Sequence, residues 1–120
     1  MERRMFHREY VTINGELVWF TKRMLRGKER HHSYVRTINI SLEGAKIEIG
    51  GIHEFSPGSK ARLQLGILQS DVSILDCSHA SQKTTLRVIY KAPSYEFISY
   101  LEEQLPTITP NRQKYEGKWL

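Results

Sequence analysis

Apolar and polar residues alternate with a period of two over residues 34–49, and this pattern constrains the fold more than any other feature of the chain. Successive side chains of an extended strand point to opposite faces, so such alternation predicts strands with one buried face. The apolar positions form two sets, which are Ile38, Ile40 and Leu42, and then Ala45, Ile47 and Ile49. Gly44 separates the two sets and predicts a sharp turn between two paired strands.

Further strands are predicted where the same alternation recurs, at residues 61–65, 72–77 and 85–90. We expect a turn at residues 55–58 and a polar loop containing residues 81–83. Within residues 10–20, Asn14-Gly15 is a strong hairpin signal, which predicts two short strands; a single strand with a bulge at the glycine is the alternative. Residues 21–33 are polar and basic and predict a surface loop.

One amphipathic helix is predicted after the last of these strands. Its apolar residues recur at helical spacing at Phe97, Ile98, Leu101 and Leu105. Pro106 marks the end of the helix. Its start has two interpretations: the helix follows Ser94 directly, or Ser99 and Glu102 form a capping box and residues 95–98 make a last strand.

These elements predict one all-β domain, which is long enough at 120 residues to bury a core. Short strands at this spacing with a single late helix are typical of a small antiparallel β-barrel, here of six or seven strands with one C-terminal α-helix. We expect a flexible arginine-rich arm at residues 1–9, the barrel and helix at residues 10–105, and a loosely ordered tail at residues 106–120.

The charge of the chain predicts an anionic partner. The net charge is +5 and the pI is about 9.5, with basic residues concentrated at positions 3–8 and 22–30. Nucleic acid, a small nucleotide or an acidic protein surface would each satisfy this balance. No apolar run approaches the roughly 18 residues of a membrane span. A single cysteine and a charged N-terminus without an apolar segment behind it predict a cytoplasmic protein.

The sequence contains no pattern that predicts an enzyme. A glycine-rich phosphate loop is absent. Cys77 has no histidine partner at a recognisable spacing and is more typical of a core residue. Asp71 and Asp76 show no acid–base pattern. The histidines lack metal-ligand spacing beside cysteine or carboxylate, so we expect surface histidines and no metal.

Arginines near the N-terminus are the first candidate ligand-binding residues. Arg3, Arg4 and Arg8 lie within the first ten positions, where no apolar periodicity places them in a core. A guanidinium group can form two parallel hydrogen bonds to a phosphate or a purine edge and can stack on a base. We therefore expect the arm to fold over an anionic ligand.

The second set of candidates lies in the run NISLEG, at residues 39–44. Asn39 and Ser41 are two positions apart, so we expect both to face the same side of one strand, where an amide and a hydroxyl can bind a base. Gly44 is expected to adopt a positive φ angle and to allow close approach of the ligand.

The two segments resemble the motifs of the PilZ family, bacterial receptors for cyclic di-GMP. Arg4 and Arg8 match its Arg-x-x-x-Arg motif, and NISLEG matches its Asp/Asn-x-Ser-x-x-Gly motif. The resemblance covers roughly residues 3–105. The chain departs from the family at Ser94, where many members have a glycine three residues before an aromatic residue, here Phe97.

The resemblance implies a PilZ-like barrel that binds cyclic di-GMP without catalysis and needs no other cofactor. The site residues that it implies are Arg3, Arg4, Arg8, Asn39, Ser41 and Gly44. Arg3 resembles an extra basic residue of members that bind two intercalated ligands, so one or two molecules per chain are expected. A downstream protein partner is expected, and nucleic acid is not. The alternatives are a barrel that binds single-stranded nucleic acid and a PilZ-like interaction module without a ligand.

Overall fold

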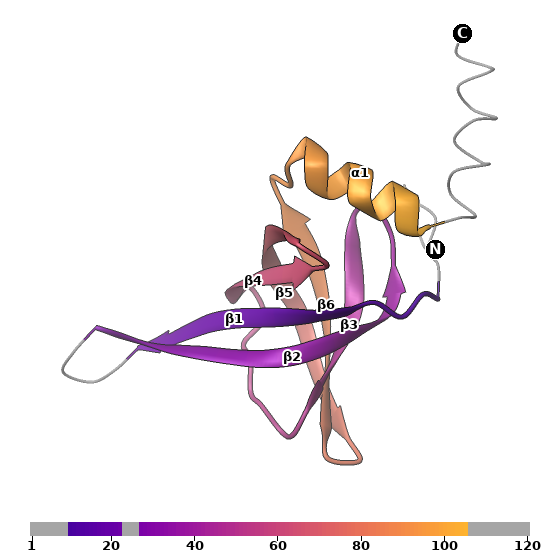
Figure 1. Ribbon diagram of the computed structural model, residues 1–120. Coiled ribbons are helices and arrows are strands. Elements are labelled where there is room, and N and C mark those ends of the chain that lie inside the picture. The colour runs from indigo at the N-terminus through magenta and orange to yellow at the C-terminus, as the bar shows by residue number, and fades with distance from the viewer. Residues whose placement is uncertain (1–9, 23–26, 106–120) are drawn as a thin grey trace, which may run out of the picture.

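The computed structural model of the chain describes residues 10–22 and 27–105. These residues form six strands and one helix (Figure 1), which are β1 (Asn14–Lys22), β2 (Lys28–Ile40), β3 (Gly44–Gly50), β4 (Lys60–Leu65), β5 (Leu68–Ala80), β6 (Lys83–Lys91) and α1 (Tyr95–Gln104). The strands close into one antiparallel barrel in the order β1-β2-β3-β6-β5-β4. The predicted all-β barrel with one C-terminal helix is confirmed.

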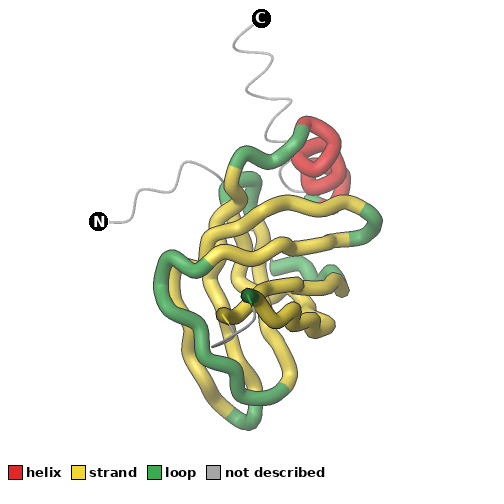
Figure 2. Tube along the Cα trace, turned by 90° about the vertical axis from the view of Figure 1, so that its left-hand side faces the viewer, coloured by secondary structure: helices red, strands yellow, loops and turns green. Residues whose placement is uncertain are grey.

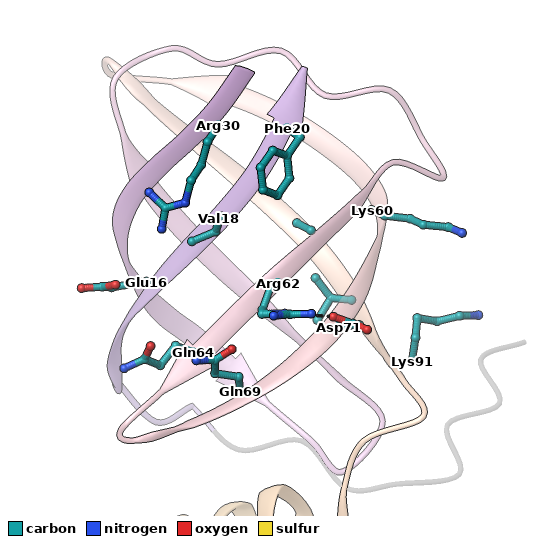
Figure 3. Close-up of a pocket in the computed structure, with 12 residues that line it drawn as sticks. Glu16, Val18, Phe20, Arg30, Lys60, Arg62, Gln64, Gln69, Asp71 and Lys91 are labelled. Atoms are coloured by element: carbon teal, nitrogen blue, oxygen red, sulfur yellow. Dashed lines mark hydrogen bonds and ion pairs between the residues drawn. The ribbon is translucent and has the colours of Figure 1, made fainter. Parts of the chain in front are cut away.

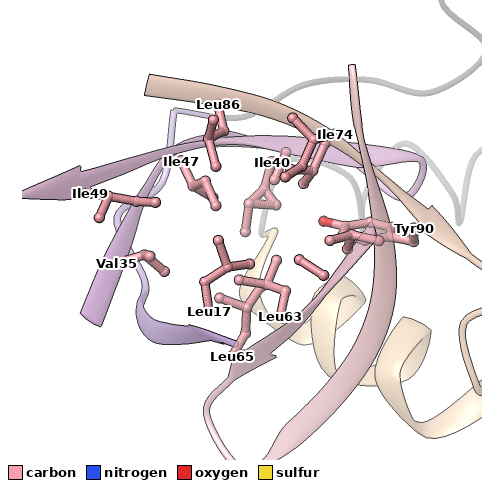
Figure 4. Packing of buried hydrophobic residues seen from close by; sticks show 14 of the residues in the cluster. Leu17, Val35, Ile40, Ile47, Ile49, Leu63, Leu65, Ile74, Leu86 and Tyr90 are labelled. Carbon is pink, nitrogen blue, oxygen red and sulfur yellow. The ribbon is translucent and has the colours of Figure 1, made fainter. Parts of the chain in front are cut away.

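Apolar side chains fill the inside of the barrel (Figure 4), as the alternation predicted. Fully buried core residues come from most of the strands and include Leu17, Ile47, Leu63, Ile74 and Leu86. A barrel of this size is wide enough only for packed side chains. Helix α1 lies across one end of the barrel (Figures 1 and 2), with Phe97 and Leu101 fully buried. Because the interior is a packed core, a ligand must bind on the outer surface or at the rim.

The hairpin predicted at Asn14-Gly15 is wrong, and these residues begin a single strand instead. Gly15 pairs with Val35 of β2 on one side and with Leu65 of β4 on the other, without a bulge. A Cβ atom on Gly15 would lie 2.1 Å from the carbonyl oxygen of Gln64. The glycine is therefore required by the close approach of β4 and not by a turn.

The surface loop predicted at residues 21–33 is also wrong. β1 continues to Lys22, and the register pairs Thr21 with Glu29 and Lys22 with Lys28. This end of the β1–β2 hairpin extends beyond the barrel (Figure 1). Its residues are exposed or half-buried, so the two strands carry no apolar alternation that would distinguish them from a loop.

The remaining connections agree with the prediction in outline. The turn at residues 55–58 is present, and Gly58 has a positive φ angle of 88°. Between β5 and β6, Ser81 and Gln82 have φ angles of 54° and 64°, as both central residues of a type I′ hairpin turn require. Both strands extend further toward this turn than predicted. Their ends are largely exposed and polar, so the alternation of apolar and polar residues did not reveal them.

Helix α1 begins directly after Ser94, so the alternative with a strand at residues 95–98 is wrong. The Ser94 side chain accepts a hydrogen bond from the backbone N–H of Phe97 at 3.1 Å and is the N-cap. Leu105 is the C-cap, so the helix ends before Pro106 as predicted. The serine that departs from the family pattern therefore has a local function, which is to start the helix.

Replacing Ser94 by alanine should lower the free energy of unfolding by about 0.5–2 kcal/mol, because the N–H of Phe97 loses its acceptor. Ser99→Ala is the matched control: Ser99 lies inside α1, and its replacement should change the unfolding free energy by less than about 0.5 kcal/mol. Urea denaturation followed by circular dichroism measures both. A larger loss for Ser99→Ala would contradict the assignment of the cap.

Candidate ligand-binding site

The structure describes half of the predicted site. Arg3, Arg4 and Arg8 lie outside the described residues. Asn39 is near the end of β2, Ser41 follows that strand, and Gly44 begins β3. The described part of the site is therefore the β2–β3 connection and its surroundings. Whether these residues bind a ligand stays a prediction.

Ser41 closes the β2–β3 turn through its own side chain. Its Oγ accepts hydrogen bonds from the backbone N–H of Glu43 at 3.1 Å and of Gly44 at 3.2 Å. Its backbone N–H donates to the carbonyl oxygen of Gly44 at 2.9 Å. Since β2 ends at Ile40, the expectation that Asn39 and Ser41 share one strand face is wrong. The hydroxyl shapes the turn that follows the strand.

Gly44 is required by packing and not by a left-handed backbone. The described glycines with a positive φ angle do not include it, so that expectation is wrong. A Cβ atom at this position would lie 2.2 Å from the carbonyl oxygen of Val88 and 3.1 Å from Cα of Ile89. Only glycine lets β3 start this close to the backbone of β6.

Tyr90 holds the same turn from the core side. Its hydroxyl donates to the carbonyl oxygen of Gly44 at 3.2 Å, and its backbone N–H donates to the carbonyl oxygen of Glu43 at 3.1 Å. Burial raises the pKa of Tyr90, so the phenol remains a neutral hydrogen-bond donor. The ring packs edge-on against Phe97 of α1, with centroids 5.1 Å apart. The turn is thereby fixed to β6 and, through it, to the helix.

Asn39 lies on the outer face of the barrel but is nevertheless buried. A register shift between Thr37 and Asn39 puts one extra residue, Ile38, into β2. Beyond it, Ile40 pairs with Ala45 on the core side, so Asn39 and its partner Lys46 belong to the outer side. Only 6 % of Asn39 is exposed.

The side-chain oxygen of Asn39 has no hydrogen-bond partner among the described residues. This Oδ1 atom is fully covered. Leaving a buried acceptor unpaired costs about 1–3 kcal/mol. Buried polar groups in folded proteins are nearly always paired, so this exception needs an explanation, and a partner outside the described residues is one.

Positive charge lies beside Asn39 on the outer face. Lys46 neighbours Arg87 of β6, which in turn neighbours Asp76 of β5. The Nε atom of Arg87 is 2.7 Å from a carboxylate oxygen of Asp76, so this cation is partly neutralised. Lys46, in contrast, has no ion pair within the described ranges. The cation next to the unpaired amide oxygen therefore remains available to an anion.

Two residues further along β3, Glu48 lies close to two other cations. Its carboxylate lies 2.8 Å from Nε of Arg36 and 3.6 Å from Nζ of Lys83. The hydrogen bond from Arg36 lowers the pKa of Glu48 below its ordinary value. Both cations of this cluster have an acidic partner, unlike Lys46.

Asp71 and Asp76 lie in two separate ion pairs on the surface of the barrel. Asp71 is bound by Arg62 at 3.1 Å and Asp76 by Arg87 at 2.7 Å. Among the described residues, no three histidine, cysteine or acidic side chains are grouped so that they could hold a metal ion.

Cys77 is half-buried and packs against the core, as a core residue was expected to do. Its Sγ lies 3.6 Å from Nε2 of His79, a neighbour that the strand pattern did not reveal. Alternation within residues 72–77 predicts that Leu75 lies on the same strand face as Cys77, but Leu75 is 41 % exposed because the register of β5 shifts between Ile74 and Asp76.

The aromatic residues divide into core and surface. Trp19 is 8 % exposed, stacks on His31 and packs edge-on against Phe55, with ring centroids 5.5 Å and 5.0 Å apart. It is therefore not available as a stacking platform. Phe20 and Tyr34 are 55 % and 73 % exposed. Phe20 lies in β1 and Tyr34 in β2, and both are on the surface of the β1–β2 hairpin.

Lys46, Arg87 and Tyr90 are site neighbours that the sequence pattern did not identify. They come from β3 and β6, and only the registers between β2, β3 and β6 bring them next to Asn39 and Gly44. Local sequence contains no signal of such pairing. The alternation within 85–90 predicted only that Tyr90 lies in a strand.

Comparison with known proteins supports the fold. No family model matches the sequence, and no curated protein matches it. The inhibitor of motility MotI/DgrA of Bacillus subtilis has a similar solved structure, with a TM-score of 0.66, 14 % identity and 92 % of this chain covered. YcgR from Escherichia coli, solved in complex with c-di-GMP, aligns with a TM-score of 0.57, 13 % identity and 100 % coverage of this chain.

At these identities the comparisons show a shared architecture, which is the PilZ-like barrel expected from the motifs. The chain spans about half of either protein, 53 % of MotI/DgrA and 52 % of YcgR. The described part of the chain contains no helix of the length and apolarity that crossing a membrane requires.

Replacing Gly44 by alanine should lower the free energy of unfolding by at least about 2 kcal/mol, because the new methyl group would overlap the carbonyl of Val88. Gly50→Ala is the control, since Gly50 ends the same strand and has nothing within 4 Å of the added atom. Denaturant unfolding of both variants measures the difference. Equal stability would show that β3 and β6 do not approach as closely as described.

Proposed function

We propose that the chain is a non-catalytic receptor module for cyclic di-GMP that belongs to the PilZ family. The ligand lies on the outer face of β2 and β3, beside Asn39, and the N-terminal arm closes over it. The closed arm then changes the interaction of the module with a downstream protein. We further propose that the protein acts in the bacterial cytoplasm.

The observation that carries this proposal is the unpaired Oδ1 atom of Asn39. A guanine has hydrogen-bond donors on one edge, among them the exocyclic N2 amino group, and acceptors O6 and N7 on another. The acceptor of Asn39 is complementary to the donor edge. Lys46, next to Asn39 on the outer face, offers a cation to a phosphate of the same ligand.

The arginines of the arm are complementary to the other features of the ligand. Arg4 and Arg8 can form paired hydrogen bonds to O6 and N7 of guanine or stack on its face, and a lysine would do neither well. A guanidinium stacked on a base contributes about 0.5–2 kcal/mol. Ordering the arm costs roughly 1–2 kcal/mol per fixed residue, so we expect an affinity on the order of micromolar.

Two proteins of similar structure also support this proposal. YcgR, solved in complex with c-di-GMP, shares the barrel, and MotI/DgrA is an inhibitor of motility. The chain spans about half of each neighbour. We therefore do not assign the cellular process or the partner of either neighbour to this chain.

Calorimetric titration with cyclic di-GMP tests the proposal. Asn39→Leu should weaken binding at least fivefold, since about 1 kcal/mol is lost with the hydrogen bond, while the empty protein should be as stable as the unchanged protein or more stable. Arg4→Ala and Arg8→Ala should each weaken binding about 30-fold, a loss of at least about 2 kcal/mol, without changing the melting temperature of the empty protein.

Lys60→Ala, on β4, is the control and should bind as tightly as the unchanged chain. Tighter binding of oligothymidylate than of cyclic di-GMP, with a steep loss of affinity in salt, would contradict the proposal and favour a single-stranded nucleic-acid barrel. Unfolding of the empty protein by Arg4→Ala or Arg8→Ala would show that the arm is structural.

The same titration gives the number of ligands per chain. Two cyclic di-GMP molecules carry about four negative charges, so a third guanidinium offsets part of their repulsion. If the unchanged chain binds two molecules, Arg3→Ala should reduce the ratio toward one. An unaltered ratio of two would remove Arg3 from the site.

A further inference from the structure

β1 and β4 pair over only part of their length, and the barrel wall opens where they separate. β1 pairs with β4 from Gly15 to Val18, but it continues beside β2 as far as Lys22. Within the described ranges, β1 between Trp19 and Lys22 has no strand on its β4 side. Alternate backbone N–H and C=O groups along such an edge are available to another extended chain.

A cavity of about 790 Å³ lies at this opening (Figure 3). Outward-facing side chains such as Val18, Phe20 and Arg62 line it. Ala61 and Val72 line it as well, although they belong to the core and are only 9 % and 1 % exposed. Because these two residues line the cavity where β1 and β4 separate, it reaches the barrel wall at that point, and we call it the β1–β4 groove.

The groove carries unbalanced positive charge. Arg62 is paired with Asp71 at 3.1 Å, and the other acid that lines the groove, Glu16, lies 3.2 Å from Nε2 of His32. Three further cations line the groove and have no acidic partner in the described part of the chain: Arg30, Lys60 and Lys91. The ring of Phe20, 55 % exposed, lies among them.

The positive charge of the groove disfavours binding of another segment of this chain or of a second copy. The segments outside the described ranges, 1–9, 23–26 and 106–120, each contain more basic than acidic residues. A second copy would bring an equally basic hairpin, with Lys22 and Lys28 at its end. Like charges placed against each other suppress such pairing. An acidic partner has the complementary charge.

We propose that the β1–β4 groove binds an extended acidic segment of a partner protein, which adds as a strand to the free edge of β1. Backbone hydrogen bonds to residues 19–22 hold the segment, and acidic side chains on alternate positions contact Arg30, Lys60 and Lys91. Small apolar side chains between them lie on Phe20 and Val18. Arg30 and Asn39 lie far apart along β2, and β4 pairs with neither β2 nor β3, so a nucleotide beside Asn39 leaves the groove free.

A peptide titration of the full chain tests this inference independently of cyclic di-GMP. The probe is a capped octapeptide of alternating glutamate and valine, and binding is followed by amide NMR shifts of the protein. We expect the shifts to be confined to residues 18–22, 30, 60–62 and 91, which form or line the groove. A peptide with lysine in place of glutamate should not bind, and methylation of alternate backbone nitrogens of the acidic peptide should weaken binding at least tenfold.

Two charge reversals on the protein locate the site. Lys60→Glu should weaken binding of the acidic peptide at least tenfold, whereas Lys83→Glu, the same charge change outside the groove, should alter it by less than twofold. Circular dichroism checks that both variants fold. The inference is overturned if the acidic peptide does not bind at millimolar concentration, or if Lys83→Glu weakens binding as much as Lys60→Glu. Tighter binding of oligothymidylate in the groove, or self-association of the chain through it, would likewise overturn the inference.

Discussion

Hydrogen bonds to the carbonyl oxygen of Gly44 connect the candidate site to the core of the barrel. This one oxygen accepts hydrogen bonds from the backbone N–H of Ser41 at 2.9 Å, from its Oγ at 3.3 Å and from the hydroxyl of Tyr90 at 3.2 Å. The arrangement exists only because Gly44 has no side chain and β6 can approach. Residues of the turn are therefore positioned by the core, and Tyr90 connects them to Phe97 and the helix.

Two regions of the barrel surface have different chemistry. On the β2–β3 side, a buried amide oxygen lies next to Lys46, and neither has a partner among the described residues, which suits a ligand with both hydrogen-bond donors and phosphate. On the β1–β4 side, the open strand edge and the excess of cations suit an extended acidic chain. The proposed receptor function requires one surface for the ligand and another for the partner protein, and both are present on one closed barrel.

The sequence predicted the elements that bury one face and missed those that do not. Alternation identified the strands around Ile47, Leu63 and Leu86 because the core imposes it. The end of the β1–β2 hairpin escaped prediction because both of its faces meet solvent. Gly15 was misread because Asn-Gly is a hairpin signal, whereas here the constraint is a carbonyl of β4, which no local pattern contains. The burial of Asn39 depends on a bulge and on pairing across three strands, and neither is visible in the run NISLEG.

A crystal structure of the full chain with cyclic di-GMP is the most direct test of the central claim. The account predicts a guanine edge within hydrogen-bond distance of Oδ1 of Asn39, with Arg4 and Arg8 closed over the same ligand. A ligand bound elsewhere on the barrel, or an Asn39 oxygen still without a partner in the saturated complex, would contradict it.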